Sequence, residues 1–224
     1  MVTTCSGDDH GADARARPLE QRFHAGASYG VFGSSLSFAD GPSRVDIQRR
    51  AVTASLEYRI TDDMTAGGGA GAGLGGLFTV GDARYKVLPG WMVTATWSRR
   101  LLDGAGRAPF LLIGLAFGAS GASTRQETTG TAAPKTASLY ALDIRAALTV
   151  GKTFWRTLSP YASVRAFGGP VFWGYNDKSI VGGDRYHFQI ALGMVAALPR
   201  GFDVFADGSP VGERAMTIGM GKSF

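Results

Sequence analysis

Apolar and polar residues alternate along most of the chain after residue 22. The alternation is clearest in residues 46–60, where both faces are complete. Successive side chains of a β-strand point to opposite sides of the sheet, so a period of two predicts strands rather than helices. The apolar face of this segment consists of Val52, Ala54, Leu56, Tyr58 and Ile60, and the polar face of Arg49, Thr53, Ser55, Glu57 and Arg59.

Segments with this alternation recur to the end of the chain, and residues 139–151 and 185–198 carry the longest apolar stripes. A strand of roughly 9–11 residues crosses a membrane at a tilt. The predicted fold class is therefore all-β, an antiparallel up-and-down transmembrane β-barrel of about ten strands, with eight or twelve strands as alternatives. We expect a flexible N-terminal segment over residues 1–22 and one barrel domain over residues 23–224.

The polar faces of these strands define the expected interior. An arginine or lysine at the middle of the lipid face costs about 2–4 kcal/mol, so Arg145, which lies opposite an apolar stripe, is expected to face inward. The same reasoning places these residues in the lumen as candidate site or pore residues: Arg49, Glu57, Arg59, Arg100, Asp143, Arg145, Arg165, Arg185, His187 and Asp203.

Glycine makes up 33 of the 224 residues, and it is concentrated in residues 65–78. There the alanines, Leu74 and Phe78 alternate with glycines, which predicts a strand with an apolar outer face and a bare inner face. A flexible linker is the alternative, but linkers favour serine over this much alanine and leucine. The bare face is expected to leave room for long arginines from other strands.

The connections between strands differ in length. We expect long outer loops at residues 39–44, 81–89, 123–136 and 174–184, and tighter turns at the other end of the barrel. Long loops on one side and short turns on the other are typical of outer-membrane barrels. Residues 168–170, Gly-Gly-Pro, are expected to bend a strand, because proline cannot donate to the ladder.

Composition excludes several classes of protein. The most apolar stretch, residues 109–119, is too short for a spanning helix. The formal charge of +5 comes from scattered arginines without a nucleic-acid-binding motif, so we expect no nucleic-acid partner. Cys5 has no partner for an internal disulfide. Residues 1–21 contain no apolar signal-peptide core, and we expect that the numbering begins after a removed leader.

The last strand ends on an aromatic residue that follows an apolar stripe: Met216, Ile218, Met220 and Phe224. In this feature the chain resembles the small Gram-negative outer-membrane β-barrels of the OmpA, OmpX and OmpW type. The resemblance covers roughly residues 23–224, and it implies that these four residues are recognised by the barrel-assembly machinery. It also implies a bacterial outer-membrane location with membrane lipids as partners. Lys222 departs from the pattern, although its ammonium can reach the headgroups.

Candidate catalytic chemistry is sparse. His187 is a candidate general base, but neither the paired acids of outer-membrane proteases nor the His and Ser spacing of lipid hydrolases surrounds it. His10, His24 and His187 are far apart in the sequence, so no metal site and no cofactor are expected. We therefore predict that the protein is not an enzyme.

Two functional hypotheses follow for the barrel. In one, an ion-pair network plugs the lumen and the protein is structural or adhesive, with residues 123–136 or the N-terminal segment as a partner surface. In the other, an arginine-lined pore favours a small anionic solute. The alternatives from other classes are a soluble lipocalin-like carrier of an apolar ligand and an outer-membrane lipid hydrolase or protease.

Overall fold

The computed structural model describes residues 22–127, 136–175 and 178–224, and these residues are almost entirely β-strand. Within them, no helix is long and apolar enough to cross a membrane. The flexible segment expected at residues 1–22, with Cys5 and His10, lies outside the described residues except for Arg22. The elements are β1 (Phe23–Phe38), β2 (Val45–Arg59), β3 (Met64–Val80), β4 (Ala83–Val87), β5 (Gly90–Asp103), β6 (Phe110–Gln126), β7 (Thr136–Gly151), β8 (Leu158–Gly168), β9 (Pro170–Tyr175), β10 (Lys178–Asp184), β11 (Phe188–Ala197), η1 (Pro199–Gly201), β12 (Phe202–Val211) and β13 (Arg214–Ser223).

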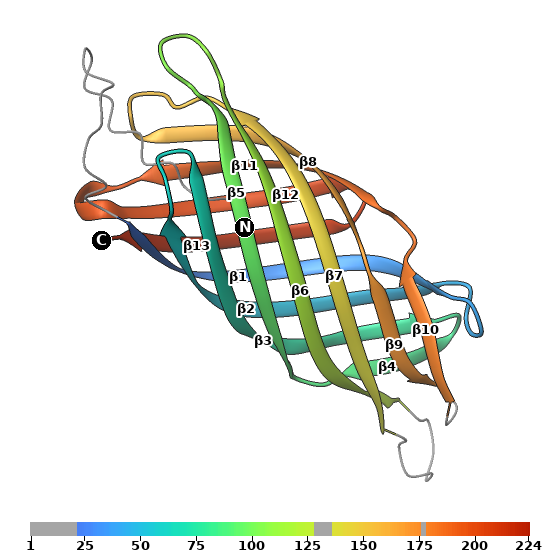
Figure 1. Ribbon diagram of the computed structural model, residues 1–224. Coiled ribbons are helices and arrows are strands. Elements are labelled where there is room, and N and C mark those ends of the chain that lie inside the picture. The colour runs from blue at the N-terminus through green and yellow to red at the C-terminus, as the bar shows by residue number, and fades with distance from the viewer. Residues whose placement is uncertain (1–21, 128–135, 176–177) are drawn as a thin grey trace.

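The strands form a closed antiparallel barrel (Figure 1). Ten of the described strands make the main ring, in the order β1, β2, β3, β5, β6, β7, β8, β11, β12 and β13, and β13 pairs with β1 to close it. Strands that are adjacent in the ring also follow one another in the chain, apart from β4 between β3 and β5 and from β9 and β10 between β8 and β11. The predicted up-and-down barrel of about ten strands is therefore confirmed.

The barrel narrows at one end. The hairpin of β12 and β13 stops at Val211 and Arg214, and beyond it β10 pairs directly with β1, from Leu36 opposite Asp184 to Phe38 opposite Gly182. A second ring of eight described strands results, in the order β1, β2, β3, β4, β6, β7, β9 and β10. We call this eight-stranded end the collar. Figure 1 shows β4, β9 and β10 at the end of the barrel away from the C-terminus.

Three interruptions connect the collar to the main ring. Leu88 and Pro89 separate β4 from β5, Gly169 separates β8 from β9, and residues 185–187 separate β10 from β11. A side chain at Gly169 would collide with the backbone of Leu142, so a glycine is required there. At the position where a bend was predicted, residues 168–170, the strand is interrupted at Gly169. The loops predicted at 81–89 and 174–184 are wrong, because most of their described residues form β4 and β10, which pair with β3, β6, β9 and β1.

In the main ring, the outward side chains are apolar and the inward ones polar. Val52, Leu56, Ile144, Leu148 and Ile218 are all between 40% and 51% exposed on the outside. Charged residues such as Glu57 and Arg165 are buried inside. This is the reverse of a soluble barrel that encloses an apolar ligand, so the lipocalin-like alternative is wrong.

The collar has the opposite interior. Its inward side chains form a hydrophobic core that fills the narrow ring. Trp173, which is 1% exposed, lies at the centre, with its ring 4.8 Å from that of Phe78 and 5.8 Å from that of Phe38. The core consists of Leu36, Phe38, Val45, Ile47, Phe78, Val87, Leu139, Val171, Trp173 and Ile180.

Phe78 was expected on the outer face of its strand, and this prediction is wrong. A β-bulge places both Leu74 and Gly75 opposite Arg50, and Gly75 has a φ of 98°. One extra residue reverses the alternation from that point on. Phe78 consequently points inward and is fully buried in the collar core.

The two ends of the described barrel meet in the closing pair of strands. The backbone N–H groups of Phe23 and Phe224 each donate to the other's carbonyl, at 3.1 and 2.9 Å. Their rings are stacked with centroids 6.0 Å apart. Lys222 lies opposite Phe202, and its ammonium is 5.0 Å from the centre of that ring. A cation–π contact at the barrel rim thus explains the residue that departs from the terminal apolar pattern.

Candidate functional site inside the barrel

The lumen of the main ring contains most of the predicted polar residues. Most of its charged side chains come from strands β1, β2, β7, β8 and β12, and these side chains form separate clusters rather than one continuous lining. Five of the ten candidates lie in these clusters, and Arg49 is buried elsewhere in the lumen. The five are Glu57, Asp143, Arg145, Arg165 and Asp203.

The first cluster is centred on His24, near the end where the termini meet. The His24 Nε2 atom is 2.8 Å from Asp203 Oδ2, and its Nδ1 atom is 3.9 Å from Glu57 Oε2. Both carboxylates are 5% exposed. Because His24 and Glu57 are directly opposite in the register of β1 and β2, the backbone holds the ring between the two acids.

Two glycines make room for this cluster. A Cβ atom at Gly221 would collide with the His24 ring and would lie 3.2 Å from Asp203 Oδ1. A Cβ atom at Gly67 would lie 2.9 Å from Glu57 Cγ. The bare inner faces of β13 and β3 therefore accommodate charged side chains from neighbouring strands, as the sequence predicted.

Replacing Gly221 with valine is expected to destabilise the barrel by about 1–3 kcal/mol, because the inserted atoms displace His24 from the two buried acids. The measurement is the temperature at which the folded band is lost in heat-modifiable electrophoresis. Met220→Val on the lipid-facing side of the same strand is the matched control and should leave that temperature nearly unchanged. Equal shifts for the two variants would contradict the role of Gly221.

The second cluster is a buried ion pair between β8 and β12. Arg165 Nη1 and Nη2 donate to the two oxygens of Asp207 at 3.1 and 2.7 Å, and the Tyr161 hydroxyl donates to Asp207 Oδ2 at 2.9 Å. Strand β11 lies between β8 and β12, and Gly193 is opposite both Tyr161 and Asp207. A side chain at Gly193 would collide with the Tyr161 ring, so the glycine opens the path across β11.

The third cluster surrounds Arg145 below the collar. Its guanidinium lies 3.4 Å from the carboxylates of Asp143 and Glu213 and 5.0 Å from the centre of the Phe167 ring. Gln189 is fully buried beside it and donates to the Glu213 carbonyl at 3.1 Å. The side chains of Arg145 and Asp143 remain 27% and 37% exposed, so the lumen is open enough here to hold water.

Arg49 lies alone on the opposite wall. It is 7% exposed, and its guanidinium is 6.0 Å from the centre of the Phe32 ring. A Cβ atom at Gly73 would lie 2.8 Å from Arg49 Nη2, so β3 again leaves space for a neighbouring arginine.

Arg59 and Arg100 lie at the mouth opposite the collar, not in the middle of the lumen. Arg59 is the last residue of β2, and Arg100 donates to the Asp62 carbonyl at 2.9 Å in the turn that follows β2. In the same turn the Thr61 hydroxyl, and after it the Arg99 guanidinium, hold the pKa of Asp63 below its ordinary value.

Arg185 and His187 were expected in the lumen, and the structure contradicts this. Both are exposed at the bend where β10 leaves β11 to pair with β1. Residues 185–187 lie between two strands, so the inward and outward alternation of the strands cannot be extended through them. His187 Nδ1 lies 3.3 Å from the Phe167 carbonyl.

Sequence reasoning missed several residues of the clusters. Asp207 and His24 are not among the residues predicted to face the lumen. The period-two rule does place His24 inward once β1 is taken to begin at Phe23. In the described part of the chain, no group of three or more His, Cys, Asp or Glu side chains is arranged to hold a metal ion. The other missed members are Tyr161, Gln189 and Glu213.

Comparisons with known proteins agree on the architecture. No family model and no curated protein sequence matches the chain. Among solved structures, the outer membrane protease OmpT from Escherichia coli is similar with a TM-score of 0.58 at 9% identity, over 95% of this chain and 99% of that one. The translocator domain of the autotransporter NalP from Neisseria meningitidis gives 0.52 at 14% identity, over 96% and 91%.

Identities this low show the fold and not the activity. Each strand of the main ring pairs with a neighbour on both sides, and the outward apolar side chains meet the requirement that a bilayer imposes on a spanning structure. The chain is therefore a closed transmembrane β-barrel with the fold of the bacterial outer-membrane barrels.

Proposed function

We propose that this protein is a closed, non-conducting barrel with a structural or adhesive role at the cell surface. The observation that carries the proposal is the hydrophobic core of the collar. Trp173, Phe78 and Phe38 occupy the axis of the narrow ring, and the Trp173 indole N–H donates to Thr124 at 2.9 Å. An interior ring packed with buried aromatic and aliphatic side chains leaves no path for hydrated ions.

The charges in the lumen support the same proposal over an anion-leaning pore. Arg165 is engaged by Asp207, and Arg145 lies between two carboxylates. Rings of arginine favour anions, whereas a lumen with more carboxylates than arginines does not. Among the described residues, Arg49, Arg145 and Arg165 face Glu57, Asp143, Asp184, Asp203, Asp207 and Glu213.

The collar is assigned to the cell-surface side. Strands β1, β2, β3, β6 and β7 have 15–17 residues, more than the roughly 9–11 needed to cross the membrane, and the excess lies in the collar. Outer-membrane barrels carry their longer projections outside the cell. A rigid, sealed projection of this kind is suited to presenting the connections between its strands to a partner.

A planar-bilayer recording tests the proposal. The purified wild-type barrel is expected to give no reproducible conductance steps while it retains heat-modifiable migration. Arg145→Ala and Arg165→Ala should leave the recording silent as well. Reproducible steps in the wild type that are lost in either variant would overturn the closed barrel and favour the arginine-lined pore.

The absence of enzymatic activity remains a prediction. The fold is shared with a protease, OmpT, and the His24–Asp203 pair has the geometry of a general base with its orienting acid. Against activity, a second buried carboxylate, Glu57, encloses the His24 ring. Hydrolysis of a peptide or lipid by the purified barrel, abolished by His24→Ala or His187→Ala, would contradict the prediction.

A further inference from the structure

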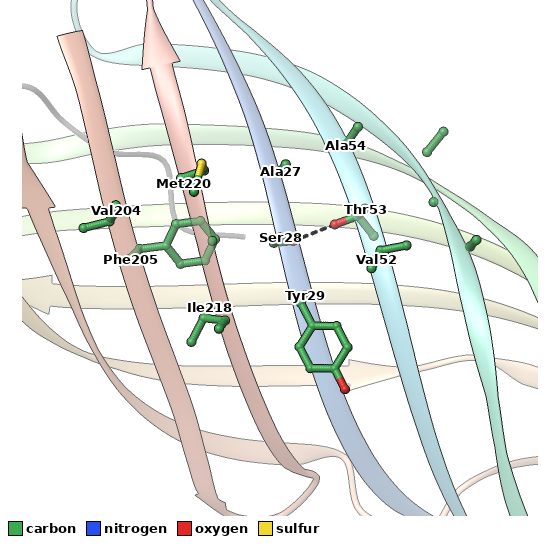
Figure 2. A pocket seen from close by; sticks show the side chains of 14 residues that line it. Ala27, Ser28, Tyr29, Val52, Thr53, Ala54, Val204, Phe205, Ile218 and Met220 are labelled. Carbon is green, nitrogen blue, oxygen red and sulfur yellow. Dashed lines mark hydrogen bonds between the residues drawn. The ribbon is translucent and has the colours of Figure 1, made fainter. Parts of the chain in front are cut away.

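The outer wall of the barrel has a shallow apolar groove over β1, β2, β3, β12 and β13 (Figure 2). Its floor is made of small residues, since Ala27 lies opposite Ala54 and Ala54 opposite Ala70 in one register row. We call this row, with Ala72, the alanine groove. Larger outward side chains border it: Tyr29, Val52, Val204, Ile218 and Met220.

Three exposed arginines lie on the collar side of this groove. Arg50 is opposite Val31 of β1, Arg214 is opposite Gly33, and the Arg185 N–H donates to the Ser35 carbonyl at 2.9 Å. They therefore flank three successive outward positions of β1 from its two sides. We call Arg50, Arg185 and Arg214 the arginine trio, and all three are exposed.

The backbone between these arginines is bare on the outside. Gly33 has no side chain, so two guanidinium groups can extend toward each other above it. Like charges gathered on one face of a sheet repel each other, and an anion bound between them removes that repulsion. Asp46, in the row of Ser35, attracts Arg185, but its carboxylate also accepts hydrogen bonds from Ser35 and Arg44. One shared carboxylate cannot balance the charge of all three arginines.

The trio and the groove are aligned along the same strands. On β2, Arg50 is four residues from Ala54, which corresponds to about 13 Å along the strand. Along the outer face of β2, the small or apolar Ala54 and Val52 give way to the polar Arg50 and Gln48. A basic site next to an apolar groove matches a lipid at the membrane interface, in which a charged headgroup is joined to an apolar acyl chain.

We propose that the trio and the groove form one binding site for a phosphate-bearing lipid of the leaflet next to the collar. The guanidinium groups hold the phosphate through charge-assisted hydrogen bonds, and one acyl chain lies on the alanine floor. The site is on the outside of the barrel, so it does not depend on whether the lumen conducts. A second copy of the barrel seated in the same groove is the competing occupant.

Native mass spectrometry of the folded full chain in an uncharged detergent tests the site. Phosphatidic acid is expected to bind at least about tenfold more tightly than phosphatidylcholine with the same acyl chains. The double variant Arg50→Gln/Arg214→Gln should lose about tenfold in affinity for phosphatidic acid, because each charged hydrogen bond contributes on that order. Arg50→Lys/Arg214→Lys should lose less, because it keeps the charges.

Two controls separate the competing explanations. Arg84→Gln/Lys86→Gln removes two exposed basic residues from another part of the collar and should not change binding. Ala54→Trp fills the groove and should weaken phosphatidic acid binding, while free inorganic phosphate should not compete. Equal losses in both glutamine pairs, equal binding of the two lipids, or a lipid-independent dimer abolished by Ala54→Trp would each overturn the proposal.

Discussion

Trp173→Ala is expected to destabilise the barrel by about 3–5 kcal/mol, the range for removal of a buried tryptophan. The side chain is 1% exposed and contacts four aromatic rings, those of Phe38, Phe78, Tyr85 and Tyr175. The variant also leaves the Thr124 hydroxyl, itself 1% exposed, without its indole donor. A cavity on the axis of the collar should then admit water, and the variant should give conductance steps where the wild type gives none.

Phe172→Ala is the matched control for this prediction. Phe172 is the adjacent aromatic residue on β9, but it faces outward and is 36% exposed. Its removal should cost less stability and should leave the bilayer silent. Denaturant unfolding in detergent micelles gives the free energy, and planar-bilayer recording gives the conductance. Silence in Trp173→Ala, with the fold intact, would show that the seal lies elsewhere.

The period-two pattern predicted the wall of the barrel well. In β2 and β7 the apolar residues predicted to face outward do so, because a charge in the middle of the lipid face is costly and the two faces therefore differ strongly there. It also identified the glycine-rich β3 as a strand, where composition alone suggests a linker. Local alternation is sufficient for these features because each strand has water or charge on one side and lipid on the other.

The pattern failed where the pairing changes. The bulge at Leu74 and Gly75 moved Phe78 inside, and the bend at residues 185–187 moved Arg185 outside. The collar exists because β10 skips the β12–β13 hairpin to reach β1. That pairing joins Leu36 to Asp184, which are 148 residues apart in the chain, and no local signal specifies it.

The clusters in the lumen were predictable only in part. The period-two pattern identified Arg165 and Asp203 as facing inward. The residues that they pair with depend on which strands lie two places apart around the ring. Tyr161 reaches Asp207 over Gly193, and His24 reaches Asp203 over Gly221. An inward glycine on the intervening strand is the feature that permits such pairs. It can be recognised from the sequence only after the strand order and register are known.

The central ion pair should be among the most sensitive features of the barrel. Asp207→Ala is expected to cost about 3–5 kcal/mol, because it leaves the guanidinium of Arg165 buried without a counter-charge. Arg165 and Asp207 are 9% and 7% exposed, and Tyr161 also loses its acceptor. Asp143→Ala, which removes a carboxylate that is 37% exposed and 3.4 Å from its arginine, should cost much less.

A double variant shows whether the instability of Asp207→Ala comes from the lost attraction or from the buried guanidinium that is left unpaired. Arg165→Met/Asp207→Leu removes both charges and keeps apolar volume, so it should recover most of the stability lost in Asp207→Ala. The measurement is denaturant unfolding of the three variants and the wild type under one set of detergent conditions. If the double variant is as unstable as Asp207→Ala, the cost does not come from an isolated buried guanidinium. The Tyr161 hydrogen bond would then be the dominant interaction of the cluster, and Tyr161→Phe alone should reproduce the loss.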